Sequence, residues 1–142
     1  MRNKVAAKHN LHEVRNEYER IDELLGIDTS KVKLEVSTRA VYQLGACAFR
    51  RNSDNEISIT IRLSDFLFNE DEGFGDVIRH EYAHVANALI NGITKGHGKE
   101  WKELCLKIGA IPRATLKKAY PLQSKRIAEH KKRKKRLLFK KR

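Results

Sequence analysis

The sequence is organised around one stretch, Val77-Ile78-Arg79-His80-Glu81-Tyr82-Ala83-His84-Val85. Residues four positions apart share a face of a helix, so the side chains of His80 and His84 can reach a single metal ion. Imidazole nitrogens suit a borderline-soft divalent cation, most often zinc. Glu81 lies to one side of the pair, where its carboxylate can take a proton from a metal-bound water without ligating the ion. This H-E-x-x-H pattern therefore predicts a zinc site with a general base beside it.

The residues around this stretch predict a helix from about residue 73 to Asn91, where Asn91-Gly92 ends it. An apolar stripe at helical spacing lies away from the two histidines and consists of Phe74, Ile78, Tyr82, Val85 and Leu89. Polar residues lie nearer the histidines. We therefore expect the back of this helix to pack on a core and its front to face a cleft.

A catalytic zinc site uses three protein ligands and keeps one position open, so a third ligand must come from another segment. The next suitable stretch is Gly96-His97-Gly98-Lys99-Glu100-Trp101, in which His97 lies between two glycines. Trp101 begins the apolar stripe of a following helix and is expected to dock that helix, which fixes His97. We favour His97 as the third ligand. Glu100 and Glu103 are the rival ligands, and Cys105 is expected in the core, with a thiolate ligand as the alternative.

The rest of the chain predicts an α+β fold. Asn10 and Glu13 are spaced as in a capping box, which predicts a helix over 11–25 that ends at Gly26. Alternating apolar residues predict three strands, over 32–36, 41–49 and 57–62, and a short helical turn over 64–68. We expect hairpin connections and a mainly antiparallel three-stranded sheet.

The positive charge of the chain is concentrated at one end. The 142 residues carry a net charge of +12, and residues 124–142 hold 11 Lys and Arg against one Glu, a net charge of +10. We therefore divide the chain into a domain over 1–123 and a basic, flexible tail over 124–142. Such a tail neutralises phosphates, so we expect it to bind the phosphate backbone of DNA. The candidate side chains are Lys125, Arg126, Lys131, Lys132, Arg133, Lys134, Lys135 and Arg136.

Two other interpretations of the tail are a solvated segment without a partner and contact with a membrane surface through residues 137–139. The two cysteines form no C-x-x-C pair, and the chain has no signal-like or long apolar run. These observations predict a protein without stable membrane insertion in a reducing compartment, the cytoplasm or nucleoid, or the nucleus in a eukaryote.

Three features together resemble the SprT-like, Spartan-related metalloproteases, over about residues 10–111. They are Tyr42-Gln43-Leu44-Gly45 leading to Ile57-Ser58-Ile59-Thr60, then His80-Glu81-Tyr82-Ala83-His84, then Gly96-His97-Gly98-Lys99-Glu100-Trp101. The resemblance implies a small zincin-like domain with one catalytic zinc ion held by His80, His84 and His97, and Glu81 as catalytic base. It also implies an endopeptidase that cleaves DNA-bound or DNA-crosslinked proteins. Many relatives carry a C-terminal zinc ribbon, which we do not expect here because no cysteine follows Cys105.

Two other function classes stay open. One is a nucleic-acid-binding protein whose metal site is structural or degenerate. The other is a metal-dependent nuclease, because a basic metalloprotein could cut RNA instead of peptide. His97 lies 13 residues beyond His84, which fits the SprT-like spacing better than that of the small histidine ribonucleases.

Overall fold

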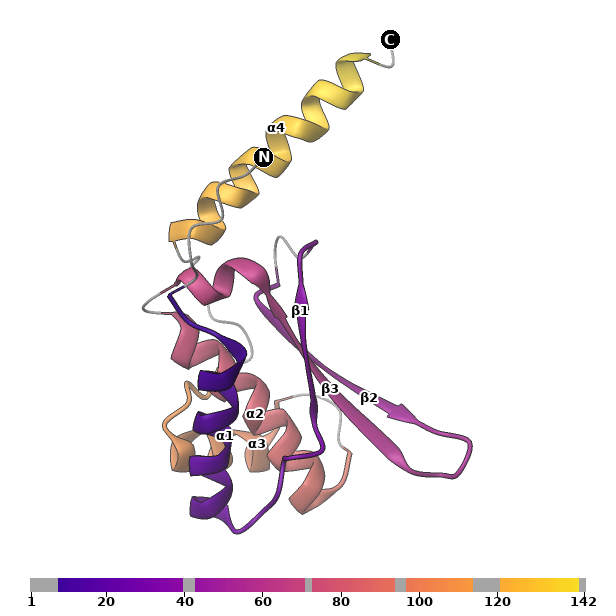
Figure 1. Ribbon diagram of the computed structural model, residues 1–142, viewed down its shortest axis with the longest axis vertical. Helices are drawn as coiled ribbons and strands as arrows, with labels where there is room; N and C mark the ends of the chain where they lie inside the picture. The colour runs from indigo at the N-terminus through magenta and orange to yellow at the C-terminus, as the bar shows by residue number, and fades with distance from the viewer. Residues whose placement is uncertain (1–7, 40–42, 71–72, 94–96, 114–120, 141–142) are drawn as a thin grey trace.

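A computed structural model describes residues 8–39, 43–70, 73–93, 97–113 and 121–140 of the chain. Within these ranges it contains four α-helices, one short 3-10 helix and a three-stranded sheet, with the helices α1, α2 and α3 gathered beside the sheet (Figure 1). The predicted α+β class is therefore confirmed.

The first helix, α1 (Leu11–Leu25), forms as its caps predict. The side chain of Asn10 accepts a hydrogen bond from the backbone N–H of Glu13, which satisfies one of the free donors of the first turn. Gly26 ends the helix with φ of 71°, a left-handed conformation that glycine adopts without strain. The buried residues of α1 are Val14, Tyr18 and Ile21.

The sheet contains β1 (Lys33–Ser37), β2 (Gly45–Arg51) and β3 (Ile57–Ser64), in the order β1-β3-β2. The antiparallel hairpin between β2 and β3 was expected, but β1 runs parallel to β3, so the sheet is mixed. The prediction that all three strands are joined by hairpins is wrong for β1. Alternation of apolar residues indicates which face of a strand is buried, but it carries no information about strand direction. Residues 41–42 of the predicted second strand lie outside the described residues.

The helical turn η1 (Asp65–Asn69) follows β3, and the histidine helix α2 (Gly73–Asn91) and the shorter α3 (Lys99–Ile108) come next. These elements share one core with α1 and β3. Its fully buried side chains include Tyr18, Ile61, Leu63, Leu67, Tyr82, Val85, Trp101 and Cys105. One predicted core residue is wrong: Leu89 is 47 % exposed, as is its neighbour Ile90 at 48 %, because the last turn of α2 extends beyond this core.

The last helix, α4 (Pro121–Lys140), covers most of the segment that the sequence predicts as a flexible tail. Proline is favoured in the first turn of a helix, and Lys, Arg and Leu are good helix formers, so a helix is compatible with this composition. Figure 1 shows α4 extending away from the rest of the molecule. In the described part of the chain, no helix is both long and apolar enough to cross a membrane.

Candidate metal centre

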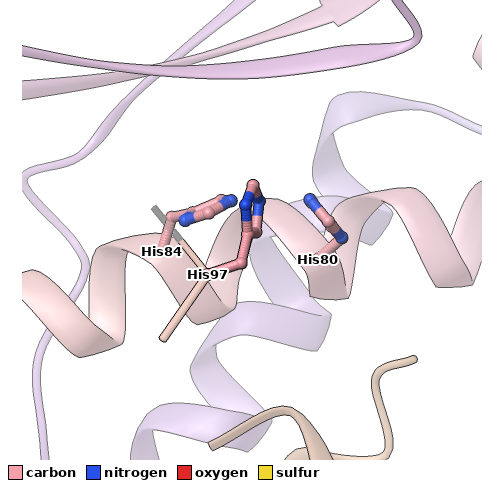
Figure 2. A group of neighbouring side chains, drawn as sticks. All are labelled: His80, His84 and His97. Atoms are coloured by element: carbon pink, nitrogen blue, oxygen red, sulfur yellow. The ribbon is translucent and has the colours of Figure 1, made fainter. Parts of the chain in front are cut away.

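Three histidines from two segments meet beside α2. His80 and His84 project from one face of α2, and His97 lies just before α3, whose first residue is Lys99. One ring nitrogen of each side chain lies within 4.8 Å of those of the other two. Figure 2 shows the three rings pointing toward one another. The arrangement offers three nitrogen atoms to one ion.

The electrostatics keep these rings neutral. Burial, with a smaller contribution from the neighbouring histidines, lowers the pKa of both His80 and His84 to about 4. Burial also lowers the pKa of His97, with a smaller effect from Lys102. A neutral imidazole has the free lone pair that metal binding requires, so the site is ready to accept a cation at neutral pH.

The described part of the chain provides no hydrogen-bond partner for any of the three rings. The Nδ1 atom of His80 is buried without a partner. A buried polar nitrogen without a partner is costly, and a metal ion is one group that would satisfy such nitrogens. Three imidazole nitrogens without hydrogen-bond partners among the described residues fit a divalent cation that prefers nitrogen ligands, such as zinc.

Glu81 is a buried carboxyl group between the two histidines of α2. It is 5 % exposed, and burial raises its pKa to about 7. Its side chain lies under the start of β2, where Gly45 has no side chain. A Cβ atom at Gly45 would lie 3.0 Å from Cγ and 3.3 Å from Oε1 of Glu81, and 3.0 Å from Cγ1 of Val77. Strand β2 therefore lies so close to α2 that a side chain at residue 45 would require Glu81 and Val77 to shift by a few tenths of an ångström.

The rival ligands lie away from the cluster or are unsuitable. Glu100 and Glu103 are exposed on α3 and are not part of the histidine group. Cys105 is fully buried in the core, and burial raises the pKa of its thiol to about 11, so it is held as a neutral thiol. Among the described residues, His97 is thus the side chain that joins the pair on α2.

Sequence analysis does not predict that Trp101 and Gly45 contact the residues of this site. Trp101 is expected to dock α3, and it is indeed fully buried, but its ring also contacts all three histidine rings. The available signal was its short separation from His97, four residues along the chain. Gly45 could be noticed only as a small residue within a predicted strand.

The predicted nucleic-acid contacts lie on α4. The side chains of residues 131–136, which are Lys131, Lys132, Arg133, Lys134, Lys135 and Arg136, are all exposed. Lys125 and Arg126 belong to α4, but their side chains lie outside the described residues. Figure 1 shows that α4 projects away from the body that contains α2 and α3, and the described basic side chains of residues 131–136 are not part of the histidine cluster. Their role in DNA binding stays a prediction.

Comparison with known proteins identifies one family and one curated relative. The family model described as the SprT-like family matches residues 7–125. Protein SprT of Vibrio atlanticus (strain LGP32) is 37 % identical over 57 residues, which cover 39 % of this chain and 34 % of that protein. The matched stretch thus spans about a third of the curated relative.

Proposed function

This chain belongs to the SprT-like family, and we propose that it is a zinc-dependent endopeptidase. The observation that carries the proposal is the pairing of three neutral histidine nitrogens with a buried carboxyl group on the same helix. His80, His84 and His97 would hold the ion, and a zinc ion bound there would polarise a peptide carbonyl and lower the pKa of a coordinated water.

Glu81 is the residue that would move the proton. A general base works best when its pKa lies near the working pH, and burial raises the pKa of Glu81 to about 7. The side chain would take a proton from the attacking water and pass it to the departing amine. Its backbone sits on the helix that also carries His80 and His84, so base and ligands keep a fixed relation.

Strand β2 offers a place for an extended peptide substrate. It is an edge strand in the order β1-β3-β2, so its outer backbone groups have no partner strand within the described sheet. Its first residue, Gly45, touches Glu81, which places this edge next to the proposed base. A peptide added to the edge of β2 would therefore pass close to the catalytic groups.

The basic helix suggests that the substrates are bound or crosslinked to DNA. Residues 124–142 carry a net charge of +10, and the exposed run 131–136 consists of six basic residues. Such a helix can displace counterions from phosphates without reading bases. Protease and DNA substrate would then be joined by one chain, with α4 holding the DNA and the histidine centre cutting the protein on it.

The direct test measures cleavage of a basic DNA-binding protein, with and without single-stranded DNA, by zinc-loaded wild type and Glu81→Gln. We expect cleavage by wild type, and none by Glu81→Gln with the same zinc content. No cleavage by wild type with one zinc bound would reject the protease and favour a structural metal site. A labelled RNA substrate is the parallel control, because its cleavage in place of protein would make the chain a nuclease.

A second test addresses α4. Deletion of residues 124–142 is expected to weaken DNA binding and to flatten its dependence on salt concentration, because fewer counterions are released. Binding is measured by fluorescence anisotropy at several salt concentrations. Unchanged affinity would remove α4 from the proposal and leave the peptidase intact.

A further inference from the structure

We propose that Trp101 is a positioning residue that orients all three histidine rings through aromatic packing, in the role that hydrogen-bond partners usually fill. This inference rests on the proposed function, because it concerns the ligands of the proposed zinc site. It goes beyond docking of α3, since the contacts of Trp101 reach both of the segments that supply histidines.

The indole ring of Trp101 contacts every member of the cluster. Its ring centroid lies 5.2 Å from that of His84 at an interplanar angle of 22°, a stacked arrangement. His80 and His97 meet it edge-on, at 5.1 Å and 71° and at 4.6 Å and 81°. Offset stacking and edge-to-face contact are the two arrangements that aromatic rings prefer. One rigid side chain thus limits the rotation of three imidazoles.

The histidine rings are not oriented by hydrogen bonds to described residues. Ligating histidines normally donate their second ring N–H to a carboxylate or a backbone carbonyl, which fixes the orientation of the ring. Within the described ranges none of the three rings makes such a bond. Ring-to-ring contacts among the histidines, at centroid distances from 4.7 to 5.6 Å, join movable rings to one another. Trp101 is the fixed point of the group, because its backbone is held in the first turn of α3.

The identity of the residue supports a role beyond filling the core. Trp101 is fully buried, and its Nε1 donor has no partner among the described residues. A phenylalanine or leucine would occupy a core position without leaving a buried donor unsatisfied. The large flat indole is instead suited to contact three rings at once.

The experiment uses the full chain and compares Trp101→Phe, Trp101→Leu and the control Ile108→Ala. Ile108 is a buried residue of α3 two turns further along the helix, so its truncation loosens α3 away from the histidines. Zinc affinity is measured by competition with a chelator, and the geometry of the site by the visible absorption spectrum of bound Co²⁺. Folding of each variant is checked by circular dichroism.

We expect Trp101→Leu to weaken zinc binding by about 10- to 100-fold, the loss typical of residues that orient metal ligands, and to change the Co²⁺ spectrum. Trp101→Phe keeps an aromatic ring, so its zinc affinity and Co²⁺ spectrum should lie between those of Trp101→Leu and wild type. Ile108→Ala should bind zinc within about twofold of wild type despite its lower thermal stability. A Trp101→Leu protein with wild-type affinity and spectrum would overturn the inference, as would a Trp101→Phe protein no better than Trp101→Leu. If Trp101→Leu does not fold, Trp101→Phe against the control decides.

Trp101 is the one tryptophan of the chain, so its fluorescence reports on the site directly. Binding of one Co²⁺ to the wild type should quench it strongly, because an ion held by the three histidines would lie next to the indole. Failure of wild type to bind either metal would overturn the proposed function itself, whereas normal binding by every variant would overturn only the role of Trp101. Binding of one Co²⁺ without quenching would place the ion away from the histidines and reject both.

Discussion

The two faces of α2 are held in place by different kinds of contact. On the back, the hydroxyl of Tyr18 donates to the backbone carbonyl of Ile78 at 2.7 Å, and the hydroxyl of Tyr82 donates to Asp22 at 2.7 Å. Asp22 in turn accepts hydrogen bonds from the backbone and side chain of Thr29. On the front, the histidines pack against Trp101 and make no hydrogen bond to any described residue.

The difference separates two tasks within one short motif. Tyr82 lies between His80 and His84 in the sequence but faces the core, where polar bonds fix the helix to α1. On the front face no described residue donates a hydrogen bond to the imidazoles, so their lone pairs stay available to an ion. A helix anchored by hydrogen bonds at the back can therefore present ligands whose nitrogens are unsatisfied at the front.

The largest expected effect comes from the proposed base on this helix. Glu81→Gln should retain zinc and lose about 10²- to 10⁴-fold in peptidase rate, because the amide cannot accept the proton. Zinc content by atomic absorption and cleavage of a labelled protein are measured together. Full activity in this variant would remove Glu81 from the mechanism.

Removal of a front-face ligand should affect the metal and leave the back face intact. His97→Ala is expected to lower zinc affinity by more than about 100-fold, because one of three protein ligands is lost. Bound zinc stabilises the folded state, so a chelator should lower the Tm of wild type and leave that of His97→Ala nearly unchanged. Glu100→Ala on the exposed side of α3 is the matched control and should behave as wild type.

In the metal-free protein, the burial of Glu81 should make the free energy of unfolding depend on pH. The pKa of Glu81 is about 7 in the folded state, above the ordinary value of 4.5. Between pH 4.5 and 7 the folded state therefore binds more protons than the unfolded state, so the contribution of Glu81 to stability falls as pH rises. Burial lowers the pKa of His80 and His84 to about 4, and these two act in the opposite direction between pH 4 and 6.5.

Substitution isolates the contribution of the carboxyl group. Metal-free Glu81→Gln should match wild type near pH 4 and exceed it by up to about 3 kcal/mol at pH 8, at 1.36 kcal/mol for each unit of pKa shift. Urea unfolding in the presence of a chelator measures the difference at each pH. A difference independent of pH would show that Glu81 titrates normally.

The smallest effect is expected from the back face. Tyr82→Phe removes one hydrogen bond to Asp22, which keeps its bonds from Thr29, so the free energy of unfolding should fall by about 1 kcal/mol. Zinc affinity should stay within about twofold of wild type. If Tyr82→Phe instead weakened zinc binding as strongly as Trp101→Leu, the two faces would not be independent.

The sequence predicts those features that depend on local spacing. The cap formed by Asn10 and Glu13, the end of α1 at Gly26 and the position of His80 and His84 on one face all follow from residues within a few positions of one another. The choice of His97 over Glu100 also agrees with the geometry, because a loop residue between glycines is free to reach α2.

The features that the sequence does not predict depend on distant contacts or on competing local preferences. The direction of β1 is decided by its crossover to the far side of β3, and the exposure of Leu89 by where the core ends. The close approach of Gly45 to Glu81 joins two elements more than thirty residues apart. In α4, high helix propensity and strong charge repulsion oppose each other, and composition alone does not decide between them.

The close contact at Gly45 has a consequence for how this protein can vary. Even one methyl group there meets Glu81 and Val77 at 3.0 Å, so the smallest substitution requires a shift of a few tenths of an ångström in side chains that include the proposed base. In a saturation mutagenesis experiment scored by activity, we expect large side chains at Gly45 to be rejected, although it supplies no functional group. Gly26 offers a contrast, because open space surrounds it and only its backbone angle is demanding. A position without a side chain can thus restrict how a site varies, through the space it leaves for the proposed base.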